Sequence, residues 1–136
     1  LVIDLPPGTG DAQLTLAQSS KLSGSIIIST PQDVALIDAR KAINMFNKVN
    51  VPVLGIVENM SYFICNKCNE RHEIFAYGGA KKEAKEFKVD FLGEFPLDKN
   101  LRINSDDGRP ACIANPNSDI AINYLNIAKS VHNKLN

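Results

Sequence analysis

Two short stretches of the sequence hold residue types that can do chemistry, and the first lies at the start of the chain. The apolar run Leu1 to Ile3 is followed by Asp4 and then by Leu5-Pro6-Pro7-Gly8-Thr9-Gly10. Such a run is typical of a strand buried on both faces, and it would place Asp4 at the strand's carboxyl end. An aspartate there suits indirect coordination of Mg²⁺ through water, and the N–H of Gly8 would face a terminal phosphate. Asp4 could also simply cap a turn, so this stretch alone leaves both interpretations open.

The second stretch is a C-x-x-C pair, Cys65 and Cys68, with His72 four residues further on. Two thiolates at this spacing can bind one metal centre, but zinc or a cubane cluster needs four ligands. Four interpretations compete: a zinc site that includes His72, a redox dithiol, a cluster shared between two chains, and two cysteines without a ligand. The spacing alone favours zinc or unligated cysteines. We expect the third cysteine, Cys112, to be a small core residue.

Three further polar or turn residues follow predicted strands. The amide of Asn59 can both donate and accept hydrogen bonds, so it could read a nucleotide base, although a turn amide is the simpler interpretation. Pro96 and Asp98 follow another predicted strand and have the same two interpretations.

The element that should accompany the Asp4 loop is missing. A P-loop needs G-x-x-x-x-G-K-[ST], whose amides and lysine hold phosphates, and neither Gly-Lys-Ser nor Gly-Lys-Thr occurs in the chain. We therefore expect a single domain over residues 1–136 that is the C-terminal portion of a P-loop fold. Its sheet should leave apolar surface and a strand edge uncovered.

Apolar runs and helical periodicity alternate along the chain and predict the framework for these residues. After the first run we expect strands at 25–29, 53–57 and 89–95, and helices from Asp11 as cap towards 24, at 34–49, at 79–88, at 97–106 and at 118–135. Residues 61–77 are expected to be an irregular loop. This alternation predicts an α/β fold in three layers, a mostly parallel sheet with helices on both faces. Ligands then bind beyond the strands' carboxyl ends, where the polar residues named above should cluster.

The composition excludes several classes of function. At 136 residues, with 44% apolar and 22% charged residues, the chain fits one soluble domain. The 15 basic and 15 acidic side chains cancel, so neither nucleic acid nor an anionic membrane is an expected partner. No apolar stretch approaches the roughly 20 residues of a membrane span. Three cysteines are too few for a secreted disulfide scaffold, which favours the reducing cytoplasm.

Taken together, these residues resemble one family. The stretches LVIDLPPGTGDAQLTLAQ, IIISTPQDVALIDARKAINMF, VPVLGIVENMSYFICNKC, FLGEFPLDKNLR and DDGRP are similar to the Mrp/ApbC iron-sulfur cluster carrier ATPases, relatives of the MinD and ParA group of deviant P-loop proteins. The resemblance spans nearly the whole chain. ENMSYF followed by C-x-x-C is more specific than either part, and it favours the shared cluster over zinc.

For the cysteines, the resemblance implies a homodimer. Cys65 and Cys68 of two subunits would supply four thiolates to a bridging [4Fe-4S] cluster, which is received from cluster donors and delivered to apo iron-sulfur proteins. Asn66-Lys67 inside the pair departs from the Pro-His that is common in the family, without removing a ligand.

For the nucleotide, the resemblance implies ATP and Mg²⁺. Asp4 matches the magnesium-site aspartate, Gly8 the turn that senses the terminal phosphate, Asn59 the adenine-reading amide, and Pro96 with Asp98 the loop that closes over the base. Because the deviant P-loop lysines are absent, we expect the chain alone neither to bind ATP tightly nor to hydrolyse it. Two other functions stay open: a MinD/ParA-like positioning ATPase, which has no use for the cysteines, and a zinc-stabilised interaction domain that uses His72.

Overall fold

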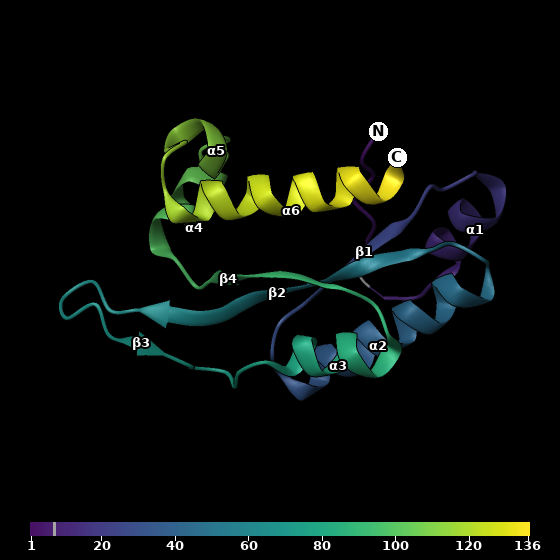
Figure 1. The fold of residues 1–136 in the computed structure, drawn as a ribbon, viewed down its shortest axis with the longest axis horizontal. Coiled ribbons are helices and arrows are strands. Elements are labelled where there is room, and N and C mark those ends of the chain that lie inside the picture. The colour runs from purple at the N-terminus through teal and green to yellow at the C-terminus, as the bar shows by residue number, and fades with distance from the viewer. Residues whose placement is uncertain (7) are drawn as a thin grey trace.

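A sheet with helices on both faces forms the centre of the computed structural model, which describes residues 1–6 and 8–136 (Figure 1). The strands are β1 (Ser25–Ser29), β2 (Val53–Ile64), β3 (Arg71–His72) and β4 (Phe91–Pro96). The helices are α1 (Asp11–Ser19), α2 (Asp33–Lys48), α3 (Gly79–Phe87), α4 (Lys99–Asp106), α5 (Ala111–Ala114) and α6 (Asp119–Leu135). The predicted α/β class is therefore confirmed. In the described part of the chain, no helix is long and apolar enough to cross a membrane.

Strand β2 is the central strand and pairs in parallel with β1 on one side and β4 on the other. Glu58 of β2 is level with Ser29 of β1 and with Glu94 of β4, so β1 and β4 end close to one edge of the sheet, whereas β2 runs on beyond it to Ile64. Figure 1 shows α2 and α3 on one side of the sheet and α6 on the other. Because both faces are covered, the middle of β2, Gly55 to Glu58, is buried without the alternation of a half-exposed strand.

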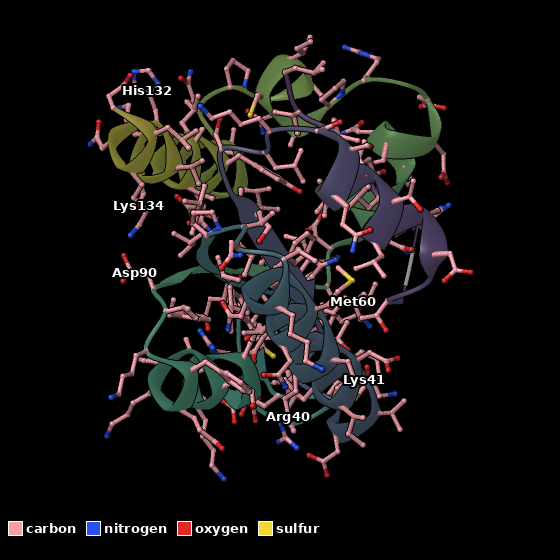
Figure 2. The ribbon with its side chains drawn as sticks, turned by 90° about the vertical axis from the view of Figure 1, so that its right-hand side faces the viewer. Arg40, Lys41, Met60, Asp90, His132 and Lys134 are labelled. Atoms are coloured by element: carbon pink, nitrogen blue, oxygen red, sulfur yellow. The ribbon has the colours of Figure 1, made fainter. Side chains whose placement is uncertain are left out.

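Helix α2 packs one apolar stripe against the sheet. Leu36, Ala39, Ile43 and Phe46 recur every three or four residues and are all buried, as an amphipathic helix requires. On the other side of the sheet, α6 contacts β4 and the residue before it at two points. Near the start of α6, the Asn123 amide donates to the Glu94 carbonyl at 2.6 Å. Figure 2 shows Lys134 and Asp90 facing each other, and their ion pair measures 2.5 Å.

A forked ion pair joins α2 to α3. The Arg40 guanidinium donates to both carboxylate oxygens of Glu83, Nε to Oε2 at 2.8 Å and Nη2 to Oε1 at 2.6 Å. The Glu83 side chain is 2% exposed, whereas that of Arg40 is 46% exposed. The hydrogen bond from Arg40 lowers the pKa of Glu83 below its usual 4.5.

This pair predicts how stability responds to acid. Because the pKa of Glu83 is lower in the folded chain, its contribution is complete above the ordinary value of 4.5 and is lost as the pH falls through the folded-state pKa. We expect the free energy of unfolding to drop over that window in the natural chain, and less steeply in Arg40→Met. Urea unfolding between pH 6 and pH 3 measures both slopes. Equal slopes in the two proteins would show that Arg40 is not the cause.

Three local predictions are wrong. Residues 1–3 are not a strand: Leu1 and Val2 are fully exposed, and no described strand pairs with them. An apolar run becomes a buried strand only where neighbours supply hydrogen bonds and cover both faces. Gly10, not Asp11, is the N-cap of α1, and the helix ends at Ser19. Cys112 is half-buried rather than a core residue.

The expected irregular loop at 61–77 also needs correction. Strand β2 runs on to Ile64 and forms an antiparallel hairpin with β3, in which Phe63 pairs with His72 and Ile64 with Arg71. As expected, apolar side chains are left uncovered on β1, where Ile28 is 60% exposed. The side of β1 away from β2 has no strand partner among the described residues.

Candidate functional site

The two cysteines lie in the turn at the tip of a hairpin that we call the cysteine arm, residues 59–78. Figure 1 shows this arm, formed by the outer half of β2 and by β3, extending beyond the helices. The turn is closed by two backbone hydrogen bonds, from the Cys65 N–H to the Glu70 carbonyl at 2.9 Å and from the Asn69 N–H to the Cys65 carbonyl at 2.8 Å. Asn69 adopts the left-handed conformation, φ 57°, which asparagine tolerates better than most residues. The sequence thus places the C-x-x-C pair on a defined, exposed turn.

The turn favours the thiolate form of Cys65. The backbone N–H groups of Cys68 and Lys67 donate to the Cys65 sulfur and lower the pKa of its thiol. Cys65 is half-buried, Cys68 is exposed, and neither forms a disulfide. Since the thiolate is both the nucleophile and the metal ligand, the turn favours the form of Cys65 that binds a soft metal centre.

His72 does not complete a metal site with the cysteines. Its ring lies beside the Phe63 ring, with centroids 6.4 Å apart, and its Nε2 is 3.8 Å from a carboxylate oxygen of Glu70. Among residues 1–6 and 8–136, no three His, Cys, Asp or Glu side chains are grouped so that they could hold a metal ion. A four-ligand centre on this arm would need two ligands besides Cys65 and Cys68.

A buried carboxylate closes the base of the arm. Glu58 is fully buried, and it accepts hydrogen bonds from the Ser61 hydroxyl at 2.6 Å, the Gly78 N–H at 3.2 Å and the Ala80 N–H at 2.7 Å. It thereby binds the first turn of α3, where a negative charge also interacts favourably with the helix dipole. Glu58 is not among the site residues predicted from the sequence. Its signal is an acid that directly follows the buried apolar run Val53–Val57.

The predicted base-reading residues lie in the middle of β2 and at the carboxyl end of β4. The register between these strands shifts after Glu58, so Asn59 lies in an irregular step of β2 and its Oδ1 accepts from the Met60 N–H at 3.0 Å. Pro96, the last residue of β4, pairs with Tyr62. Asp98 is the N-cap of α4 and accepts from the Leu101 N–H at 2.7 Å.

The cap gives Asp98 a structural role that can be measured. We expect Asp98→Ala to lower the free energy of unfolding by about 1 kcal/mol, because the Leu101 N–H loses its acceptor. Asp98→Asn should cost far less, since asparagine caps helices about as well. Urea denaturation compares the three proteins. An asparagine variant as unstable as the alanine variant would show that the cap is not the cause.

Asp4 and Gly8 are not joined to this group. Asp4 is exposed and forms no hydrogen bond or ion pair with any described residue. Gly8 is exposed at φ 92°, a conformation that favours glycine, and open space surrounds its Cα. The roles predicted for these two residues at a phosphate and Mg²⁺ remain predictions.

Comparison with known proteins agrees on one family. Residues 1–132 match the family described as "ParA: NUBPL iron-transfer P-loop NTPase". The iron-sulfur cluster carrier protein of Pseudomonas fragi is 52% identical over 128 residues, which are 94% of this chain and 45% of that protein. The iron-sulfur cluster transfer protein NUBPL of Mus musculus is 51% identical over 135 residues, 99% of this chain and 42% of that protein. The chain therefore spans less than half the length of these relatives.

Two solved structures share the fold. A nucleotide-binding protein from Archaeoglobus fulgidus, in complex with ADP and with cobalt, has a TM-score of 0.71 at 44% identity and covers 85% of this chain and 46% of its own. The cell division ATPase MinD of Pyrococcus furiosus has a TM-score of 0.64 at 20% identity, with coverage of 82% and 43%. At that identity, the second likeness shows the fold alone.

Proposed function

The chain belongs to the family of NUBPL-type iron-transfer P-loop NTPases, and on this basis we propose that it carries an iron-sulfur cluster and delivers it to apo-proteins. The observation that carries the proposal is the tip of the cysteine arm. Cys65 and Cys68 lie there in a turn whose N–H groups favour the thiolate of Cys65. An exposed turn that lowers the pKa of one of its two thiols is open to a cluster and also to the protein that accepts it.

We propose that the cargo is a [4Fe-4S] cluster held between two copies of the chain. Such a cluster takes four thiolates, and one arm supplies two. A twofold axis through the cluster would bring the same two cysteines from each copy, since a symmetric dimer uses the same surface twice. This explains how a chain with one C-x-x-C pair can bind a cubane. The other partners in the proposal are cluster donors and apo iron-sulfur proteins. We place the protein in the cytoplasm, since its three cysteines are free thiols.

The family name supports a link to ATP and Mg²⁺, and the relative from Archaeoglobus fulgidus was solved with ADP. We assign Asp4 to the magnesium site, Gly8 to the terminal phosphate, and Asn59, Pro96 and Asp98 to the adenine base. Phosphate transfer also needs a lysine-bearing P-loop, and the sequence contains none.

The 136-residue chain alone should therefore release phosphate from ATP no faster than buffer does, because the sequence lacks the P-loop lysine that neutralises the charge on the phosphates. A phosphate-release assay with and without Mg²⁺ measures this. Turnover that requires Mg²⁺ and disappears in Asp4→Ala would contradict the prediction.

Cluster delivery can be tested directly. The chain is loaded anaerobically with iron and sulfide, separated from free iron, and mixed with the apo form of an enzyme that needs a [4Fe-4S] cluster for activity. We expect the enzyme to regain activity even when an iron chelator is present, because the cluster passes between proteins without release. Recovery that the chelator abolishes, or no recovery from a loaded chain, would contradict the proposed function.

A further inference from the structure

One side chain, Arg71, connects the cysteine arm to the sheet. Its Nη2 donates to Glu94 Oε1 of β4 at 3.2 Å. Its guanidinium carbon also lies 3.9 Å from the centroid of the Tyr62 ring and 4.8 Å from that of Tyr77. Tyr62 belongs to the outgoing strand β2, and Tyr77 lies where the chain returns to α3. Arg71 therefore contacts both sides of the arm and the neighbouring strand.

The backbone of the arm needs such support. Strand β3 has only two residues, and its ladder with β2 consists of the pairs Phe63–His72 and Ile64–Arg71. An isolated hairpin of this kind is marginally stable in water. Arg71 directly follows Glu70, whose carbonyl accepts the hydrogen bond that closes the cysteine turn. Movement of Arg71 would therefore displace the neighbouring Glu70 carbonyl and with it the cysteine turn.

The contact with Glu94 extends to the buried base of the arm. The Ser61 hydroxyl lies 3.2 Å from Glu94 Oε2 and 2.6 Å from Glu58 Oε1. Glu94 thus lies between Arg71, in the middle of the arm, and the group that fastens the arm to α3. The arm is attached to the body at two separate points, and Arg71 is the outer one.

We propose that Arg71 is a positioning residue that fixes the cysteine arm against β4 and so determines how Cys65 and Cys68 are presented to a cluster. The part of this that concerns the cluster rests on the proposed function, whereas the fixing of the arm concerns the chain without metal. A lysine at this position would keep the charge near Glu94. It could not lie as a flat group against two rings while it also donates to Glu94, so it should replace arginine only in part.

The first test uses the metal-free chain. Amide hydrogen exchange is measured in the natural chain and in the variants Arg71→Ala, Arg71→Lys and Arg102→Ala. Arg102 is an exposed arginine paired with Asp106 inside α4, so it controls for the loss of a surface ion pair. We expect Arg71→Ala to speed exchange at the Cys65 and Asn69 amides at least tenfold, with Arg71→Lys between it and the natural chain. Exchange at the core amide of Ile56 should stay the same in all four. Unchanged exchange at Cys65 and Asn69 in Arg71→Ala would overturn the proposal.

The loaded chain gives the second test, the rate at which an iron chelator removes iron. We expect Arg71→Ala to lose iron at least tenfold faster than the natural chain and to show an altered visible spectrum of the cluster. Its temperature of global unfolding should not change. Arg102→Ala should behave as the natural chain does. Faster amide exchange without faster iron loss would overturn the role in presenting the cysteines. If the natural chain takes up no cluster, the proposed function fails, and the exchange data still decide whether Arg71 fixes the arm.

Discussion

Replacing Cys65 with alanine should abolish cluster binding. In the proposed dimer this change removes two of the four thiolate ligands at once, one from each chain. The two that remain cannot hold a cubane. We expect iron to fall from about four atoms per dimer to nearly none, with loss of the visible absorption of the cluster. The same change should remove the dimer, because the cluster is the proposed link between the two copies. Iron analysis, absorption spectra and native mass measure these three results.

Two variants make this result specific to the arm. Cys112→Ala removes a half-buried cysteine outside the arm and should leave iron, spectrum and mass unchanged. His72→Ala should also leave them unchanged, since the His72 ring lies beside Phe63. Full iron content in Cys65→Ala would show that Cys65 is not a ligand. Loss of a bound zinc from His72→Ala would show that the metal is zinc.

Glu58→Ala should cause a large loss of stability, about 3 kcal/mol or more in the free energy of unfolding. The change leaves the N–H groups of Gly78 and Ala80 and the hydroxyl of Ser61 without their buried acceptor. The stability of Glu58→Gln should lie between those of the natural chain and Glu58→Ala. Glutamine keeps the volume and one oxygen of the side chain, but it turns an NH₂ group towards a donor. Urea denaturation at neutral pH measures all three proteins.

Glu73→Gln is the matched control for this prediction. Glu73 lies on the same arm but is exposed, so the loss of its charge should change stability by at most about 0.5 kcal/mol. A Glu58→Ala protein as stable as Glu73→Gln would mean that the buried carboxylate does not hold α3 to the arm.

The sequence predicts the parts of the fold that depend on local pattern. The apolar runs at Ile26–Ile28 and Val53–Val57 and the helical stripe of α2 are strong signals, and the structure contains the corresponding elements. The pattern fails where pairing decides the outcome. Leu1–Ile3 has the composition of a strand but no described strand beside it. The outer half of β2 is a strand because Tyr62 pairs with β4 and because β3 folds back on Phe63 and Ile64.

The same distinction applies to the site. Spacing identifies Cys65 and Cys68, since a C-x-x-C pair is visible in any sequence. Spacing cannot show that the Cys68 N–H donates to the Cys65 sulfur, because that depends on the fold of the turn. The contact of Arg71 with Glu94 spans 23 positions and arises only when the arm lies against β4. Chemistry-bearing residues were therefore predictable, and the contacts that orient them were not.

The metal content and native mass of the chain purified without oxygen decide whether two copies share an iron-sulfur cluster. Iron, acid-labile sulfide and zinc are measured on the same sample whose mass is determined. We expect about four irons and about four sulfides for every two chains, in a particle of twice the mass of the chain. Zinc without sulfide, in a particle with the mass of one chain, would rule out the shared cluster.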